Sequence, residues 1–246
     1  MVSDLPAVLE ARAKLTLSLR VTGRRDDGYH FIDAEMVTLD LADRLELEPG
    51  DGLEVTGAAG DSVPADDHNL VRRALAAAGR QAHVRLCKQI PAGAGLGGGS
   101  ADAAAVLRWA GIDDLTIAAK LGADVPFCIV GGRAQVTGVG EEIRPLQFEE
   151  IEGTAYTLLI PPIHTSTRDV YLEWDAMGSP AGENGNDLEC AAVRVSPELS
   201  KWRNRLGEAT GEQPRLAGSG STWFVEGAFP GEDRLVVRVA RGSESG

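Results

Sequence analysis

Apolar and polar residues alternate along several stretches of this chain, with the period of two that is typical of half-buried β-strands. In residues 14–21 (KLTLSLRV) every second side chain is apolar, so Lys14 and Thr16 are expected on the opposite, polar face. Further strands are expected in FIDAEMVTLDL, RLELEP, GLEVTG, HVRLCKQI and RAQVTGVG. Turns containing Pro, Gly or Asp separate several of them, which predicts an antiparallel sheet.

Other stretches have the spacing of helices. They are NLVRRALAAAGR, SADAAAVLRWAG and DLTIAAKLG, followed by STRDVYLEWDAM, DLECAAVRV and PELSKWRNRLG, with strand patterns in YTLLIPP, RLAGSGSTWFVEG and RLVVRVA. In SADAAAVLRWAG, Ser100 is the expected N-cap and Gly111 the expected C-cap. Strands and helices without strict alternation predict an α+β chain. A boundary near residues 145–155 would divide it into domains 1–150 and 151–246.

Composition and charge narrow the class of protein. With 43% hydrophobic residues the chain can bury a substantial core, and no stretch reaches the roughly 18 apolar residues of a membrane span. The first residues lack the layout of a signal peptide, so we expect a cytoplasmic protein. The net charge of −13 comes from acidic residues spread along the chain, which disfavours nucleic acid and anionic membranes as partners.

The cysteines and histidines predict neither a disulfide framework nor a structural metal site. Three cysteines are an odd number and lie far apart, and the four histidines are scattered, with none four residues from another. Ligands for a catalytic metal cannot be assigned from this pattern.

A glycine-rich run is the strongest signal for chemistry. Five of the seven residues from Gly93 to Gly99 are glycine, and a helical pattern follows at once. A backbone free of side chains lets several N–H groups point at one anion, and the helix adds the positive end of its dipole. A flexible turn is the alternative, although so many glycines would carry a large cost in conformational entropy. The run therefore predicts a phosphate site.

Two other phosphate motifs fit less well. A Walker loop ends in Gly-Lys-Ser/Thr, whereas Gly99 is followed directly by Ser100. Gly93, Gly95 and Gly98 do match the dinucleotide pattern G-x-G-x-x-G. However, the preceding strand carries Arg85 and Lys88, whereas the first strand of a dinucleotide fold is buried on both faces and almost wholly apolar. A NAD-binding oxidoreductase remains the less favoured alternative.

The run resembles the Pro-x-Gly-x-Gly-Leu-Gly-x-x-Ser motif of the GHMP kinases, with A-x-A-K-L at residues 11–15 and GSGST at 218–222 resembling the family's other two signatures. The three motifs follow the family's order and cover most of the chain. The resemblance implies a two-domain GHMP kinase fold, with a ribosomal protein S5 domain 2-like N-terminal half that binds ATP and Mg²⁺ and a ferredoxin-like α+β C-terminal half. The nucleotide-binding residues it implies are Asn69, Pro91, Gly93, Gly95, Leu96, Gly97, Gly98, Gly99 and Ser100.

Further segments (TGRRDDGYH, HNLVRRA, GADVPF and STRDVY) are similar to the diphosphocytidyl-methylerythritol kinases in particular. That resemblance implies ATP-dependent phosphorylation of the 2-hydroxyl of diphosphocytidyl-methylerythritol in non-mevalonate isoprenoid synthesis, by a monomer or homodimer whose substrate carries a cytidine diphosphate group. A kinase of the homoserine or mevalonate type is the alternative.

The same resemblance implies a role for each remaining candidate. Asp124 would be the catalytic base and Lys14 the partner that polarises it. Tyr29 and Tyr171 would stack on the two faces of the cytosine and His30 would bond its edge, a chemistry that aromatic rings and an imidazole can supply. Either tyrosine could instead be an ordinary packing residue.

Thr16 and Thr167 are the other substrate contacts that the resemblance implies. Thr16 stands where the family usually has Asn, and Arg12 where it usually has Pro. The threonine keeps one hydroxyl but lacks the paired donor and acceptor of the amide.

Overall fold

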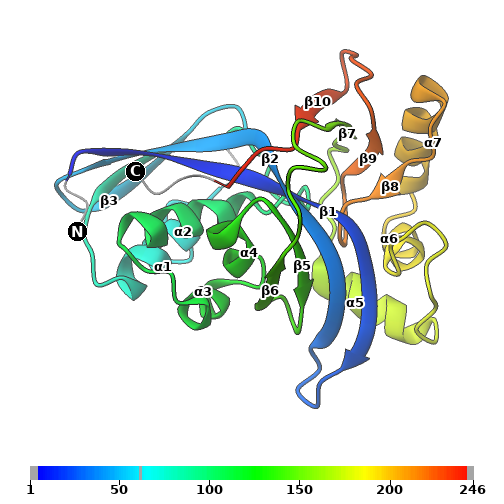
Figure 1. The fold of residues 1–246 in the computed structure, drawn as a ribbon, viewed down its shortest axis with the longest axis horizontal. Helices are drawn as coiled ribbons and strands as arrows, with labels where there is room; N and C mark the ends of the chain where they lie inside the picture. Colours follow the sequence, from blue (N-terminus) through cyan, green and yellow to red (C-terminus); the bar gives the residue numbers. More distant parts are fainter. Residues whose placement is uncertain (1–4, 61–62, 243–246) are drawn as a thin grey trace.

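Two β-sheets organise the chain in a computed structural model that describes residues 5–60 and 63–242 (Figure 1). The first sheet contains β1 (Ala7–Arg24), β2 (His30–Glu48), β3 (Gly52–Thr56), β4 (His83–Cys87), β5 (Arg133–Thr137) and β6 (Glu142–Pro145). Its order is β3-β4-β2-β5-β6, with β1 paired to β2. The second sheet contains β7 (Ala155–Leu159), β8 (Arg215–Leu216), β9 (Trp223–Glu226) and β10 (Leu235–Arg238), in the order β10-β7-β9-β8.

Strand direction excludes the dinucleotide-binding alternative. Among the named strands of the described residues, β3 and β4 pair in parallel and every other pair is antiparallel. A dinucleotide fold requires a doubly wound parallel sheet. The expectation of an antiparallel sheet is confirmed apart from that one pair.

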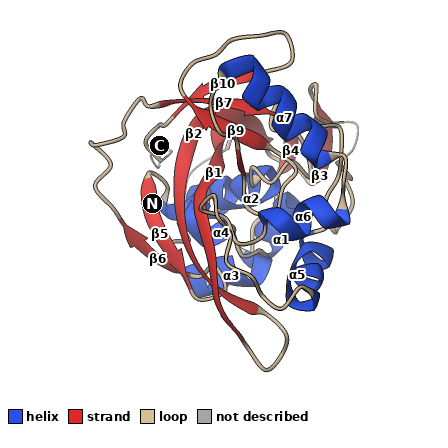
Figure 2. Ribbon diagram, turned by 90° about the vertical axis from the view of Figure 1, so that its right-hand side faces the viewer, coloured by secondary structure: helices blue, strands red, loops and turns tan. Residues whose placement is uncertain are grey.

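β1 and β2 form a long hairpin within the first sheet, and Figure 2 shows its two strands running side by side. The strand predicted at residues 14–21 is confirmed, but β1 is longer and is not half-buried at its centre. Ala13 to Thr16 are all buried, and the register with β2 shifts between Arg12 and Lys14. Such irregularities re-aim side chains, and both faces of this segment are covered.

Helices cover the sheets in two groups (Figure 1). The first group is α1 (Leu70–Ala77), α2 (Gly98–Trp109), α3 (Leu115–Leu121) and α4 (Val125–Val130), and the second is α5 (Thr167–Ala176), α6 (Glu189–Val195) and α7 (Leu199–Thr210). The first group packs on the first sheet through an apolar cluster that includes Leu45, Leu86 and Leu107. Within the described residues, none of these helices has both the length and the apolar character needed to cross a membrane.

The start of α2 differs from the prediction by three residues and its end by one. Ser100 is not the N-cap: the cap is Gly97, in a left-handed conformation with φ of 69°, and it makes no side-chain cap bond. The helix begins earlier because glycine adopts this conformation without strain. Ala110 is the C-cap, and Gly111 follows it with φ of 76°.

An apolar cluster joins the two sheets. Leu15 of β1 and Leu39 of β2 belong to the same cluster as Leu158 of β7 and Phe224 of β9. One sheet ends at Pro145 and the other begins at Ala155, so the boundary expected near residues 145–155 falls between them. The division into domains 1–150 and 151–246 stays a prediction, and the first and last four residues of those ranges lie outside the described part.

Candidate active site

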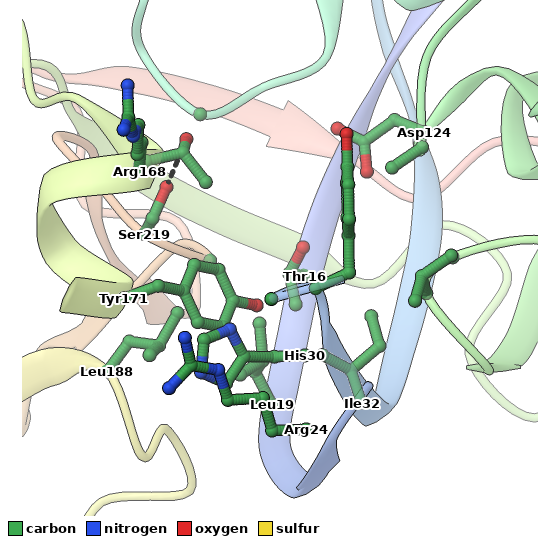
Figure 3. A pocket seen from close by; sticks show the side chains of 18 of the residues that line it. Thr16, Leu19, Arg24, His30, Ile32, Asp124, Arg168, Tyr171, Leu188 and Ser219 are labelled. Carbon is green, nitrogen blue, oxygen red and sulfur yellow. Dashed lines mark hydrogen bonds between the residues drawn. The ribbon is translucent and has the colours of Figure 1, made fainter. Parts of the chain in front are cut away.

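A cavity of about 720 Å³ opens where several chain segments distant in sequence meet (Figure 3). They include the β1–β2 hairpin, the glycine-rich run, the junction of α3 with α4, helix α5 and the turn before β9. All three regions that carry sequence signatures contribute to its wall. Lys14, Gly95, Asp124 and Gly218 line it together.

Lys14 and Asp124 form an ion pair at the inner end of this cavity. The Nζ atom of Lys14 lies 3.4 Å from Oδ2 of Asp124 and donates a hydrogen bond to Oγ1 of Thr16 at 3.1 Å. The Lys14 side chain is 6% exposed and that of Asp124 33%. Asp124 precedes α4, and its carboxylate makes no bond to the start of that helix. The Asp124 carboxylate is therefore accessible to a ligand, while the buried Lys14 ammonium contacts this carboxylate from the protein side.

The glycine-rich run packs directly against Lys14. The backbone N–H of Lys14 donates to the carbonyl of Leu96 at 3.0 Å. A Cβ atom on Gly97 would lie 2.8 Å from Cγ of Lys14, and one on Gly95 would lie 2.5 Å from the carbonyl oxygen of Gly220. A side chain at either position would collide with the neighbouring segment. Glycine is thus required here for close approach as well as for its positive φ.

The first turn of α2 is suited to hold an anion. The first N–H groups of a helix have no partner within the helix, and here they follow a backbone without side chains. The first turn carries no acidic residue. Ser100 lines the cavity, and its Oγ lies 3.7 Å from the place that a Cβ on Gly122 would take. The hydroxyl therefore faces the segment that carries Asp124.

The GSGST turn closes the site from the C-terminal half. Thr222 binds the carbonyl of Ala94 in the glycine-rich run through its hydroxyl, at 2.7 Å. Ser219 shares a hydrogen bond of 2.8 Å with Thr167 at the start of α5. The Cβ position of Gly218 lies 3.8 Å from Nζ of Lys14. Three segments far apart in sequence therefore meet around one ammonium group.

An aromatic pair forms another wall of the cavity, as Figure 3 shows. The rings of His30 and Tyr171 stack with centroids 4.7 Å apart and planes at 22°. Nε2 of His30 lies 2.9 Å from Oδ1 of Asp175, whose other oxygen lies 3.4 Å from Arg24. Burial, with a smaller effect from Asp124, raises the pKa of Tyr171 above that of an ordinary phenol, so its hydroxyl stays protonated.

The second tyrosine lies apart from this pair. Tyr29 also lines the cavity, but it is 62% exposed and the guanidinium of Arg25 lies 5.3 Å above its ring. The structure brings both tyrosines to one cavity, with the imidazole of His30 on one face of Tyr171. A cytosine held between the two tyrosines stays a prediction.

Several predicted nucleotide contacts do not line this cavity. Asn69 caps α1: its side chain accepts from the N–H of Val71 at 2.9 Å and donates to the carbonyl of Pro64 at 2.7 Å. These bonds give Asn69 a helix-capping role, and a contact of this residue with the nucleotide stays a prediction. Leu96 is 1% exposed and belongs to the apolar cluster between the sheets. Its contribution to the loop is packing.

Two groups of charged residues have a place in or near the site that the sequence patterns did not predict. Asp175 bonds His30, and its position four residues after Tyr171 on a predicted helix was the available signal, because residues at that spacing share a face. The other group is the buried set of Lys88, Asp43 and Asp102 beneath the glycine-rich run. From the sequence, Lys88 is only a charged residue that disfavours a dinucleotide-binding fold.

Comparisons with known proteins point to one family. Residues 69–132 match the family model for the GHMP kinases N terminal domain. A 4-diphosphocytidyl-2-C-methyl-D-erythritol kinase of Cereibacter sphaeroides is 37% identical over 91% of this chain and 89% of its own. One of Bradyrhizobium diazoefficiens is 34% identical over 99% and 97%.

Solved structures give the same result. A crystal structure of a 4-(cytidine 5'-diphospho)-2C-methyl-D-erythritol kinase superposes with a TM-score of 0.70 at 35% identity, covering 89% of both chains. A homoserine kinase from Cytophaga hutchinsonii covers 97% of this chain and 96% of its own, with a TM-score of 0.61 at 17% identity. At that identity the likeness shows the fold alone.

Proposed function

The chain belongs to the 4-diphosphocytidyl-2-C-methyl-D-erythritol kinases within the GHMP kinases, and from this membership we propose how its cavity carries out the reaction. The enzyme phosphorylates the 2-hydroxyl of a cytidine diphosphate derivative with ATP, in isoprenoid precursor synthesis. We assign the phosphoryl transfer to Lys14 and Asp124. The observation that carries the assignment is the buried Lys14, which contacts both the glycine-rich run and Asp124.

Asp124 is the acceptor for the proton of the attacking hydroxyl. Transfer of a γ-phosphoryl group needs that hydroxyl in line with the phosphorus and its proton accepted. The Asp124 carboxylate faces the cavity, and Lys14 lies 3.4 Å from it, where the ammonium can also contact the transferred group. The hydroxyl of Thr16 fixes the ammonium from a second side. A substrate hydroxyl beside Asp124 would then lie next to the first turn of α2.

ATP is the phosphate donor, and the phosphates lie against Gly95 to Ser100 in this proposal. The free N–H groups at the start of α2 and the positive end of its dipole would hold them. This local field offsets the net charge of −13, which by itself would repel a polyphosphate.

Mg²⁺ fits this site through few protein ligands. Among the described residues no group of three or more His, Cys, Asp or Glu side chains is arranged to hold a metal. Mg²⁺ usually binds through one or two protein oxygens together with substrate phosphates and water. Ser100, on the first turn of α2, lines the cavity and is the oxygen donor that would hold it together with the phosphates. Bound there, the ion would neutralise charge on the transferred phosphate.

We propose that the cytidine base binds at the wall formed by Tyr29, His30 and Tyr171. Aromatic faces hold a base by stacking, and an imidazole reads its edge by hydrogen bonding. Nε2 of His30 lies 2.9 Å from Oδ1 of Asp175, and a tautomer that donates from Nε2 to this carboxylate would present Nδ1 as an acceptor for the exocyclic amine of cytosine. Uracil carries a carbonyl at that place. In this proposal the face of the base packs against the aromatic side chains that form this wall.

A coupled assay of ADP release tests the proposal. The purified enzyme is given ATP and Mg²⁺ with the cytidyl substrate, its uridyl analogue, homoserine or mevalonate. We expect release with the cytidyl substrate and a kcat/KM at least about tenfold lower with the uridyl analogue, because a site built for one hydrogen-bond pattern rejects the other. Equal turnover of the uridyl analogue would remove the proposed role of His30. Turnover of homoserine or mevalonate alone would overturn the substrate assignment.

A further inference from the structure

Three charged side chains are buried together beneath the glycine-rich run. The ammonium of Lys88, just after β4, donates to Oδ2 of Asp43 on β2 and, at 2.7 Å, to Oδ2 of Asp102 on α2. The side chains of Lys88, Asp43 and Asp102 are 2%, 0% and 3% exposed. We call these three residues the lysine cluster. None of them lines the cavity, so none contacts the substrate there.

Stability alone does not account for the lysine cluster. Removing charges from water carries a large cost, and well-packed apolar residues of similar volume are often as stable or more so. One oxygen of Asp102 is moreover buried without a hydrogen-bond partner among the described residues. A buried ion cluster can instead fix the relative positions of the strands and helices that carry its residues.

The contacts of the lysine cluster fall on both ends of the phosphate-binding run. Oδ1 of Asp43 accepts the N–H groups of Gln89 at 2.5 Å and Ile90 at 2.8 Å, immediately before the run begins. Asp102 lies on α2, which begins where the run ends. Lys88 joins these two carboxylates. The ammonium therefore connects the entry of the run to the helix at its exit.

Lys88 also lies directly under the proposed anion site. A Cβ on Gly98, the first residue of α2, would lie 3.2 Å from Nζ of Lys88 and 3.0 Å from Cγ2 of Ile90. Because the carboxylates of Asp43 and Asp102 offset its charge, Lys88 acts on this site through the position of the run and not as a positive field.

We propose that the lysine cluster is a positioning device that holds the glycine-rich run in its phosphate-binding shape, so that Lys88, Asp43 and Asp102 determine the affinity for ATP without touching it. This role rests on the proposed function, in which the run binds the phosphates. A preformed loop does not have to be ordered when ATP binds, and this lowers the cost of binding.

The test compares two substitutions at one position. Asp102→Asn keeps an oxygen that can accept the hydrogen bond of Lys88, whereas Asp102→Leu has a similar volume but no acceptor. Burial, opposed by Lys88, raises the pKa of Asp102 to about 7, so the amide resembles a form that the wild type also populates near neutral pH. Arg108→Met is the matched control, because Arg108 bonds the carbonyl of Cys128 near the far end of the same helix.

The dissociation constant for ATP is measured by calorimetric titration, and KM for the cytidyl substrate by the coupled assay. We expect Asp102→Leu to raise the ATP dissociation constant about tenfold or more, equivalent to about 1.4 kcal/mol. Asp102→Asn should stay within about threefold of wild type, and KM for the cytidyl substrate should not change in either. Arg108→Met should lower the melting temperature and leave ATP affinity unchanged.

A folded Asp102→Leu variant with wild-type ATP affinity overturns the proposal, as does an Asn variant that is impaired as much as the Leu variant. If Asp102→Leu does not fold, the double variant Lys88→Met, Asp102→Asn decides, because it retains the bonds of Asp43 to the run; the same tenfold rise is expected. If neither folds, the lysine cluster is a requirement of folding and the positioning role is refuted. A wild-type enzyme that does not bind ATP would instead refute the proposed function.

Discussion

A single methyl group added at Gly97 separates the two reasons for having glycine there. The residue has φ of 69°, and a Cβ would lie 2.8 Å from Cγ of Lys14. In Gly97→Ala the left-handed conformation alone should cost about 1 to 2 kcal/mol of stability. The methyl also has to be accommodated, and the stem of Lys14 must move by about 0.7 to 1.2 Å to restore the usual carbon–carbon separation of about 3.5 to 4.0 Å.

That displacement should reach the catalytic pair. Lys14 contacts Asp124 at 3.4 Å, and a misplacement of about 1 Å at reacting groups can cost about 10²-fold in rate. We therefore expect kcat of Gly97→Ala to fall by about 10²-fold. Gly111→Ala is the matched control, because Gly111 follows the same helix with φ of 76° and its Cβ would meet nothing within 4 Å. It should lose similar stability and keep its kcat.

The two variants are compared by denaturant unfolding and by the coupled assay at saturating ATP and substrate. Similar losses of unfolding free energy would show that backbone strain is matched between them. The reasoning is refuted if Gly97→Ala retains a kcat within about threefold of Gly111→Ala while both are folded. Lys14 would then tolerate the displacement, or its position would not matter for transfer.

Three further outcomes are expected. Asp124→Asn should lower kcat by about 10²- to 10⁴-fold with little change in the ATP dissociation constant, since an amide cannot accept the proton. Turnover within about tenfold of wild type would refute the role of Asp124 as the proton acceptor. Tyr171→Ala should raise KM for the cytidyl substrate about tenfold and leave KM for ATP unchanged, because stacking contributes about 1 to 3 kcal/mol per base. Tyr171→Phe keeps the ring and should retain a normal KM for the cytidyl substrate. A normal KM in the alanine variant would contradict the base site. Burial raises the pKa of Asp102 to about 7, against about 3.9 when unfolded, so the native state binds more protons between these values and wild-type stability should fall as pH rises through them. The unfolding free energy of Asp102→Asn relative to wild type should therefore increase from about pH 4 to about pH 7 and then level off, and a difference that does not vary with pH would show that Asp102 is not perturbed.

Local signals in the sequence were enough for the fold class and for the phosphate-binding run. The alternation at residues 14–21 predicted β1, and the glycines from Gly93 to Gly99 predicted a loop leading into a helix. Both rest on short-range rules of backbone geometry, so neighbours in sequence are sufficient. The same rules misplaced the start of α2 at Ser100, because capping statistics favour serine whereas here glycine provides the turn.

The roles of Lys14 and Asp124 came from resemblance to a family, since neither residue type at its position specifies a catalytic role. A lysine on the polar face of a strand is usually solvated, whereas here the glycine-rich run packs over β1 and the Lys14 side chain is 6% exposed. Burial of this kind is a property of the whole fold. Composition therefore could not indicate that this ammonium would hold a carboxylate on a different element.

The sequence by itself determined the elements and the motifs; the tertiary structure alone decided which charged groups meet. Lys88 breaks the alternation of its segment, yet it is buried because Asp43 from β2 and Asp102 from α2 converge on it. His30 is likewise oriented by Asp175, which lies on a helix far along the chain. Hydrophobic periodicity reports whether a face is buried, whereas ion pairs depend on distances between separate elements, and those distances exist only once the chain has folded.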